Sequence, residues 1–267
     1  MMKNSIILTL AAAFVLLLGT KYIFGQDFSA LEIMKKNDQQ RKSRDERVEL
    51  TMKLINRKGK ERVRKVSQFT MTDASDNQKS LIRFLSPADV KGTGLLTVEH
   101  SNRDDDQWLY LPALKKVRRI SASDQSDNFM GTDFAYEDLG SEELENYDYK
   151  LLGTENLDGV ECYLIEAVPN NEKEKKASGY SKRHLWIRRD NFVGILIKYY
   201  DKKGELLKIF KASDIRLIEG TNKWRAHRME MENVQTRHKT VLLFDNFAIN
   251  QGLKGKLFTQ RYLQRGR

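Results

Sequence analysis

Apolar and polar side chains alternate along most of the chain beyond residue 47. In residues 48–54 (VELTMKL), apolar side chains occupy every even position and polar ones every odd position. A period of two places the apolar set on one face of a β-strand. Residues 56–60 (NRKGK) follow as a turn in which Gly59 can adopt a positive φ. The pattern therefore predicts a β-hairpin at the start of a sheet.

The same alternation returns about every ten residues, with short polar turns between the segments. Turns such as residues 156–159 (NLDG) and 201–204 (DKKG) end in glycine, as many hairpin connections do. Because the strands do not alternate with long helices, an antiparallel meander is expected rather than a doubly wound parallel sheet. The predicted strands are residues 48–55, 62–72, 80–85, 93–100, 107–111, 114–120, 147–152, 159–168, 183–188, 193–200, 205–213, 215–219, 224–232 and 236–247.

Other segments lack this alternation. Residues 27–47 carry apolar side chains at helical spacing near their start, with Asp27 or Ser29 available as a cap, so one helix is expected. Residues 121–145 scatter aromatic side chains among Gly, Ser and Asp, which predicts a loop with one or two helical turns. The polar residues 172–182 are expected to form a mobile loop, and the basic residues 256–267 fit a strand or a short helix.

The alternation shows that each strand buries one face, but it does not show what covers that face. A closed barrel, a sandwich and an open half-barrel capped by helices all satisfy it. The few helical segments carry apolar residues suited to covering an opening, and the apolar sets contain flexible methionines and aromatics that suit variable apolar ligands. The favoured fold is mainly β: a single unclosed antiparallel β-barrel (half-barrel) with helices covering the concave face.

The N-terminus resembles a targeting segment. After Lys3, residues 5–20 contain no charged side chain. As a helix this stretch would reach about 24 Å, short of the ~30 Å hydrocarbon core, so a Sec-type signal peptide over residues 1–25 is predicted. Cleavage after Gly25 or Gln26 would leave Ile23 or Phe24 at the −3 position, which departs from the small-residue rule. An uncleaved inner-membrane anchor is therefore the alternative, and residues 26–267 are expected in the periplasm.

The chain is basic, with 47 Lys and Arg against 37 Asp and Glu, a formal net charge of +10. These cations are spread along most strands, which fits a solvated surface or weak attraction to anionic lipid headgroups. The export signal and the absence of a recognisable nucleic-acid-binding motif argue against a nucleic-acid partner. The single cysteine, Cys162, cannot form an internal disulfide and is expected to be a small buried hydrophobe.

Candidate catalytic chemistry is sparse. His100 precedes three acids at residues 104–106, which fit a turn better than a metal site. His227 alternates with Met229 and Met231, but no nucleophile or paired base accompanies it. The acidic cluster in residues 137–145 shows no spacing typical of glycoside hydrolysis, and no phosphate-binding glycine loop is present. No enzymatic activity, cofactor or metal is therefore predicted.

Several blocks of sequence resemble bacterial outer-membrane lipoprotein-sorting proteins, in a LolA-like branch of the LolA/LolB superfamily. The more specific blocks are residues 107–120 (QWLYLPALKKVRRI) and 126–139 (SDNFMGTDFAYEDL). Residues 84–89 (FLSPAD), 92–94 (GTG) and 185–190 (LWIRRD) also fit, and the likeness covers residues 48–247. No lipid-modified cysteine lies near the N-terminal segment, which separates the chain from the anchored LolB type.

The resemblance implies an unclosed barrel with helices across its mouth and a cavity that holds acyl chains during transit across the periplasm. It implies a lipid or acylated lipoprotein as cargo, transient membrane contact, and a resistance-nodulation-division (RND) type transporter as a partner. Residues 26–267 would then be one LolA-like lipid-binding β domain, with residues 121–145 as its lid. The alternatives are a non-catalytic envelope protein that binds a transporter or polypeptide through its concave sheet, and an envelope hydrolase.

The candidate lipid-binding residues follow from the alternation and from the quoted blocks. Arg118 and Arg119 are either solvated strand charges or headgroup contacts at the cavity rim. The candidates for the cavity itself are Leu50, Met52, Leu109, Leu111, Phe129, Met130, Phe134, Tyr136, Ile195, Ile197, Tyr199, Met229 and Met231.

Overall fold

One antiparallel sheet dominates the computed structural model of the protein, which describes residues 28–101 and 103–265. Its strand order is β6-β5-β4-β3-β2-β1-β13-β12-β11-β10-β9-β8-β7, with β14 pairing beside β1. The strands are β1 (Asp45–Ile55), β2 (Glu61–Thr72), β3 (Gln78–Ser86), β4 (Gly94–Val98), β5 (Asp106–Leu111), β6 (Lys116–Arg119), β7 (Tyr147–Leu157), β8 (Val160–Pro169), β9 (Lys182–Arg188), β10 (Gly194–Tyr200), β11 (Leu206–Leu217), β12 (Trp224–Asn233), β13 (His238–Phe244) and β14 (Ala248–Ile249).

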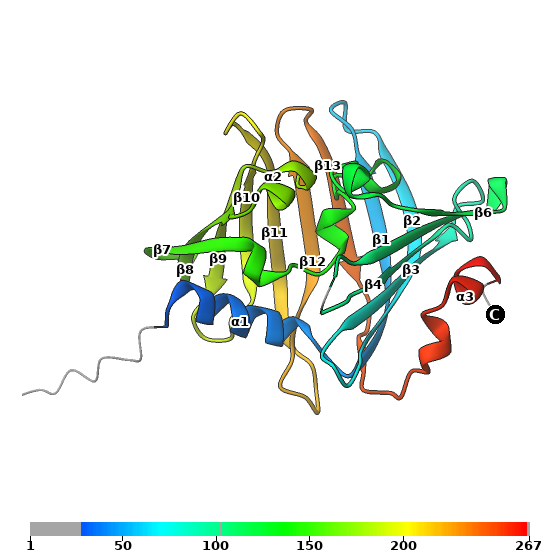
Figure 1. The fold of residues 1–267 in the computed structure, drawn as a ribbon, viewed down its shortest axis with the longest axis horizontal. Helices are drawn as coiled ribbons and strands as arrows, with labels where there is room; N and C mark the ends of the chain where they lie inside the picture. Colours follow the sequence, from blue (N-terminus) through cyan, green and yellow to red (C-terminus); the bar gives the residue numbers. More distant parts are fainter. Residues whose placement is uncertain (1–27, 102, 266–267) are drawn as a thin grey trace, which may run out of the picture.

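The sheet consists of two meanders joined by their first and last strands. β1 pairs with β13, and Met52 lies opposite Leu242 in that ladder. This pairing leaves β6 and β7 as the two edges of the sheet, which curves around a concave face without closing (Figure 1). The prediction of a mainly β, unclosed antiparallel half-barrel is confirmed.

The chain between the two edges has to cross the open side of the half-barrel. Residues 121–145, which we call the lid segment, run from β6 to β7 in front of the concave face (Figure 1). The predicted loop contains more helical turns than expected. They are the 3₁₀ turns η2 (Ala122–Asp124), η3 (Phe129–Gly131), η4 (Glu137–Leu139) and η5 (Leu144–Asn146), the last of which reaches β7.

Helix α1 (Ala30–Arg41) also covers the concave face, near β7 to β10 (Figure 1). Ser29 and Glu32 form a capping box at its start, and Ile33 and Met34 are buried against β8 and β9. The expected helix over residues 27–47 is too long. From Asp45 onward the backbone pairs with β2, and then also with β14. These ladders give the buried backbone N–H and C=O groups more hydrogen-bond partners than a further, highly charged helical turn would, so the helix ends before them.

Two further segments differ from or refine the expectations. Residues 172–182 were expected to be a loop, but α2 (Glu172–Ala177) forms there because the Asn171 side chain accepts the Glu174 N–H at 2.9 Å as an N-cap. The C-terminal segment adopts the helical alternative, as η6 (Gly255–Leu257) and α3 (Gln260–Arg265). Leu263 of α3 packs on Leu81 and Leu96, on the outer face of the sheet.

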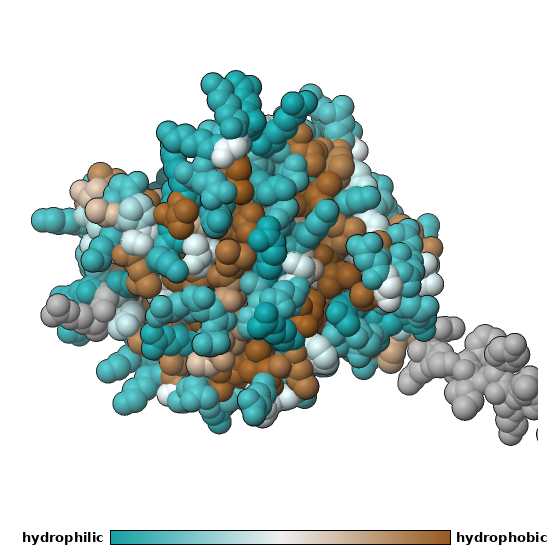
Figure 2. All heavy atoms as spheres, turned by 180° about the vertical axis from the view of Figure 1, so that it is seen from behind, coloured by the Kyte–Doolittle hydropathy of each residue, from teal (hydrophilic) through white to brown (hydrophobic). Residues whose placement is uncertain are grey.

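Burial is divided between the two faces of the sheet. The largest apolar cluster lies on the concave face, beneath the lid segment, and includes Leu50, Phe84 and Met231. Much of the outer face is hydrophilic, with hydrophobic residues visible between the hydrophilic ones (Figure 2). Cys162 is fully buried, as expected, and burial raises the pKa of its thiol to about 11.

None of the helices among residues 28–101 and 103–265 has the length and apolar character needed to cross a bilayer. The predicted targeting segment, residues 1–25, falls outside the described residues.

Candidate functional site

A cavity of about 480 Å³ lies between the concave face of the sheet, the lid segment and α1. Its volume falls within the range of small-molecule sites, roughly 300–1,000 Å³. Strands from both meanders contribute to its wall. The apolar lining includes Met34, Val48, Leu50, Met52, Val66, Ile82, Phe129, Phe134, Leu185, Ile187, Ile197, Tyr199, Phe210, Met229, Met231, Leu242 and Phe244.

Many of the residues predicted from the sequence line this cavity. They come from β1, β10, β12 and the lid segment, and the β1–β13–β12–β11–β10 order of the sheet brings these strands together. The predicted residues that line it are Leu50, Met52, Phe129, Phe134, Ile197, Tyr199, Met229 and Met231.

Other predicted residues belong to the same apolar cluster without lining the cavity. Leu109 and Tyr136 are buried in it, and Leu111 and Met130 pack against it. The lid segment lies over this part of the sheet: the Gln107 side chain on β5 donates to the Tyr136 carbonyl at 3.0 Å. The apolar side chains Leu109 and Leu111 of β5 therefore pack under the lid segment instead of facing the space, although Gln107 of the same strand lines it.

Ile195 lies elsewhere, because β10 carries a β-bulge. The register with β9 shifts between Gly194 and Leu196, so Ile195 has no partner residue in β9. A bulge interrupts the strict alternation of faces along a strand. Ile195 is half-buried and does not line the cavity, although Ile197 and Tyr199 do.

Arg118 and Arg119 lie on the edge strand β6, outside the cavity lining. The Arg118 guanidinium pairs with Asp124 at 3.1 Å, and the Arg119 guanidinium pairs with Asp106 at 2.6 Å. Hydrogen bonds from Arg103, and then from Arg119 and His100, hold the pKa of Asp106 well below its usual range. Both arginines thus already have carboxylate partners, and headgroup contact by them stays a prediction.

A buried ion pair fastens the lid segment to β9. The Nη1 atom of Arg183 lies 2.6 Å from Oε2 of Glu142, and the Tyr149 hydroxyl donates to Oε1 of the same carboxylate at 2.5 Å. Burial acts to raise the pKa of Glu142, but Arg183 and these hydrogen bonds outweigh it, and the pKa lies below its ordinary value. The guanidinium also lies over the Tyr147 ring, 4.6 Å from its centroid.

A second buried group joins the lid segment to β11. Lys208 and Asp138 lie 3.7 Å apart, and the Tyr180 hydroxyl donates to the Asp138 carboxylate at 2.9 Å. Burial raises the pKa of Asp138, although Lys208 and hydrogen bonds from Ala135 and Tyr180 oppose the shift. Polar side chains on the concave face of β9 and β11 therefore hold the lid segment, alongside its apolar contacts.

Two further carboxyl groups have strongly raised pKa values. Burial, reinforced by the Asp138 charge, raises the pKa of Glu137 to about 7, although the Gly179 N–H donates to it at 2.8 Å. Burial likewise raises the pKa of Asp105 to about 6. Both carboxyl groups line the cavity, so the charge of the cavity lining changes near neutral pH.

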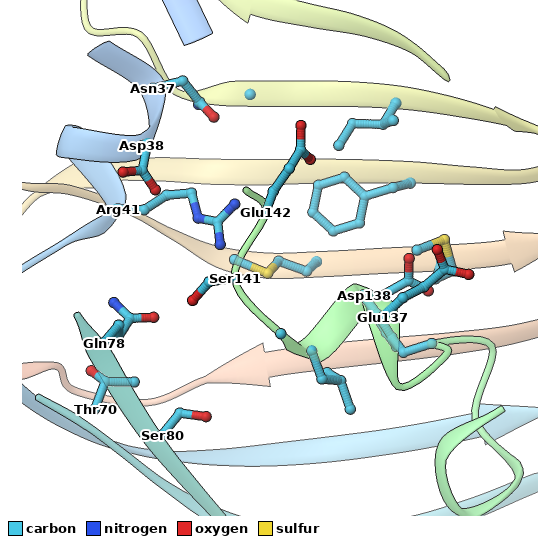
Figure 3. Close-up of a pocket in the computed structure, with 18 of the residues that line it drawn as sticks. Asn37, Asp38, Arg41, Thr70, Gln78, Ser80, Glu137, Asp138, Ser141 and Glu142 are labelled. Carbon is cyan, nitrogen blue, oxygen red and sulfur yellow. The ribbon is translucent and has the colours of Figure 1, made fainter. Parts of the chain in front are cut away.

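The polar lining gathers between α1, the lid segment and the ends of β2 and β3. Figure 3 shows these side chains converging on the cavity beside its apolar wall. The labelled side chains are Asn37, Asp38 and Arg41 from α1, Thr70, Gln78 and Ser80 from β2 and β3, and Glu137, Asp138, Ser141 and Glu142 from the lid segment.

Comparisons with other proteins agree with this architecture. A family model described only as "uncharacterized protein" matches residues 76–265. An outer membrane lipoprotein-sorting protein domain from Vibrio parahaemolyticus is 34% identical, covers 88% of this chain and 98% of its own, and superposes with a TM-score of 0.82. The chain belongs to the family of outer membrane lipoprotein-sorting proteins.

Two other solved structures are similar to this chain of the lipoprotein-sorting family. A DUF1329 family protein from Desulfovibrio piger is 33% identical over 88% of this chain and 97% of its own, with a TM-score of 0.81. A LolA superfamily protein from Nitrosomonas europaea shares the fold at 21% identity, covering 88% of this chain and 100% of its own, with a TM-score of 0.68. None of the curated proteins matches the chain. Family membership is consistent with the envelope location predicted from residues 1–25.

This lipoprotein-sorting family member contains polar contacts that the sequence analysis did not predict. The acidic residues 137–145 are conspicuous in the sequence, but their partners Arg183 and Lys208 follow far along the chain. One sequence feature could have indicated a buried partner. Lys208 alternates with Leu206 and Phe210, so a lysine occupies a position on the apolar face of its strand. Within the described ranges, no group of three or more His, Cys, Asp or Glu side chains could hold a metal ion.

Proposed function

We propose that this protein is a non-catalytic periplasmic carrier that binds acyl chains of lipids or lipoproteins and delivers them toward the outer membrane. The observation that carries the proposal is the cavity of about 480 Å³, with its large set of apolar lining residues beneath the lid segment. Met52, Met229 and Met231 contribute flexible side chains to that wall, which suits acyl chains of variable shape.

The energetics suit a carrier. Burying an acyl chain contributes ~0.8 kcal/mol per methylene, so ten methylenes would give ~8 kcal/mol, near micromolar affinity before entropic costs. An interaction of this strength can extract a chain and still release it to a tighter acceptor. No nucleotide is required for such a transfer.

The lid segment is the element that we expect to control access. It connects the two edges of the sheet and lies across the concave face, so its displacement would open the cavity without unfolding the meanders. As its partner we propose an RND-type transporter, which is what the sequence resemblance implies. The N-terminal segment would export the carrier to the periplasm if it is a signal peptide, and would hold the carrier at the inner membrane if it is an uncleaved anchor.

Native mass spectrometry of the protein purified from the cell envelope, followed by lipid extraction, tests this function. We expect a stoichiometric lipid or acylated peptide to accompany the protein. A fluorescent acyl ligand should compete with that cargo for the same site. A protein that arrives empty and takes up no acyl ligand would contradict the carrier function and favour an interaction role for the concave sheet.

A further inference from the structure

The polar end of the cavity carries side chains that the fold itself does not use. Thr70 on β2 and Ser80 on β3 face each other in the ladder, Gln78 lies two residues from Ser80, and Ser141 approaches from the lid segment (Figure 3). Within residues 28–101 and 103–265, no hydrogen bond involves the side chain of any of these four residues. The cavity therefore presents a set of uncommitted hydroxyl and amide groups at one end.

Arg41 supplies a positive charge at the same end. Its side chain extends from α1 toward Ser141 and lines the cavity (Figure 3). Its guanidinium forms neither a hydrogen bond nor an ion pair with any part of the chain that the structure describes. The Arg41 carbonyl alone is engaged, as an acceptor for Arg225 at 3.2 Å.

The acids nearest to Arg41 already have other cations. Asp38 pairs with Lys42 at 3.1 Å, and Glu142 pairs with Arg183 at 2.6 Å. The other cations that line the cavity are also paired: Arg225 binds Glu46 at 2.8 Å, and Lys173 binds Asp104. Arg41 is thus the cavity-lining cation, within the described residues, that forms no ion pair, although its charge acts on the Glu142 carboxylate from beyond ion-pair distance.

We propose that this polar end binds the phosphate of a phospholipid headgroup, with Arg41 as the cation and Thr70, Gln78, Ser80 and Ser141 as hydrogen-bond donors. The inference rests on the proposed carrier function, because the tails would occupy the apolar end. A guanidinium with surrounding hydroxyl and amide groups is the donor set that a phosphate prefers. The bound lipid would then have a defined orientation in the cavity.

Acidic side chains beyond Ser141 restrict the kind of headgroup. Asp105 accepts the Ser141 N–H at 3.3 Å, and Asp105 and Glu143 both line the cavity without an ion-pair partner in the described chain. These carboxyl groups would repel a headgroup of purely negative charge and attract an amine next to the phosphate. A zwitterionic aminophospholipid is therefore the class of lipid that fits this end of the cavity, because its phosphate suits the Arg41 donor set and its amine suits the acidic side chains.

Competition binding on the full chain purified from the envelope tests the inference. The competitors are phosphatidylethanolamine and diacylglycerol with identical acyl chains, displacing a fluorescent acyl ligand. We expect phosphatidylethanolamine to bind about tenfold more tightly, the order expected for a charge-assisted hydrogen bond. Arg41→Gln should abolish this preference and leave diacylglycerol binding unchanged. Lys35→Gln removes the same charge from another exposed residue of α1 that does not line the cavity, and should retain the preference.

The outcomes separate this inference from the carrier function. An Arg41→Gln variant that binds diacylglycerol normally and still prefers phosphatidylethanolamine would overturn the headgroup assignment and leave the carrier function standing. A wild-type chain that binds neither lipid would overturn both. Inorganic phosphate should not displace bound phosphatidylethanolamine, because it lacks the tails; displacement would identify a free-phosphate site and contradict the assignment.

Discussion

The Arg183 guanidinium of β9 and the Glu142 carboxylate of the lid segment lie 2.6 Å apart, and their side chains are only 12% and 17% exposed. Because the lid segment joins the two edges of the sheet, this pair fixes the cover of the cavity to its wall. The ion pair is therefore a point at which the stability of the fold and access to the cavity are coupled.

Replacing Arg183 with methionine should release the lid segment and destabilise the protein. The Glu142 carboxylate would remain buried without its cation, which costs about 3–5 kcal/mol in comparable cases. Urea unfolding measures this loss, and faster uptake of an acyl ligand would report a loosened lid segment. Arg216→Met is the matched control, because Arg216 pairs with Asp214 on the surface and should cost less than about 1 kcal/mol. Equal losses for both variants would contradict a special role for Arg183.

Lys208 and Asp138 should behave as a coupled pair. Their side chains are 4% and 6% exposed, so Lys208→Met alone leaves an acid in an apolar site. Adding Asp138→Asn removes the remaining charge and should recover part of the stability. A double-mutant cycle of unfolding free energies should give a coupling of about 1–3 kcal/mol. Strictly additive costs would show that the two side chains act independently.

Filling the cavity should impair acyl binding with little loss of stability. Met229 is half-buried and lines the cavity, so Met229→Trp places a ring where an acyl chain would lie. Displacing about two methylenes at ~0.8 kcal/mol each would weaken affinity about tenfold. Leu217→Trp adds the same ring at a residue that is 51% exposed outside the cavity, and should bind normally. Unchanged affinity in Met229→Trp would argue against this cavity as the acyl site.

Stability should fall as the pH rises through neutrality. The pKa of Glu137 is about 7 in the folded chain against an ordinary value of 4.5, so the folded state holds its proton more tightly than the unfolded chain. Stability from this group is complete below pH 4.5 and is lost as the pH rises toward and past 7. Besides burial, the groups that act on this carboxyl are the Asp138 and Arg183 charges and the hydrogen bonds from Ser178 and the Gly179 N–H.

Glu137→Gln tests that assignment, because glutamine stays neutral and can still accept the Gly179 N–H. Urea unfolding at about pH 5 and about pH 8 should show a drop on the order of 2 kcal/mol in the wild type and a smaller drop in the variant. Some slope should remain, because Asp105 also has a raised pKa. The exposed Glu205→Gln should keep the full slope. A variant with the wild-type slope would assign the effect to other groups.

Local patterns along the chain determined most strands and turns of this protein, although the two strands expected at residues 205–213 and 215–219 form the single strand β11. The period of two in residues 48–54 and the turn at residues 56–60 both depend on neighbouring residues only, and β1 and β2 appear where they were expected. The same holds for the cavity-facing side chains of β1 and β12, because alternation assigns them to one face. Tertiary contacts were needed to end α1 at Arg41, since pairing of Asp45 with β2 competes with helix formation there.

Only the tertiary structure decided which apolar side chains border open space. Leu50 and Leu109 both lie on the concave face, but the lid segment covers Leu109, and nothing in the pattern of β5 reveals that cover. The pairing of Met52 with Leu242 and the approach of Arg183 to Glu142 join residues far apart in sequence. Alternation reports the face of a strand, whereas packing across long sequence separations determines what lies against that face.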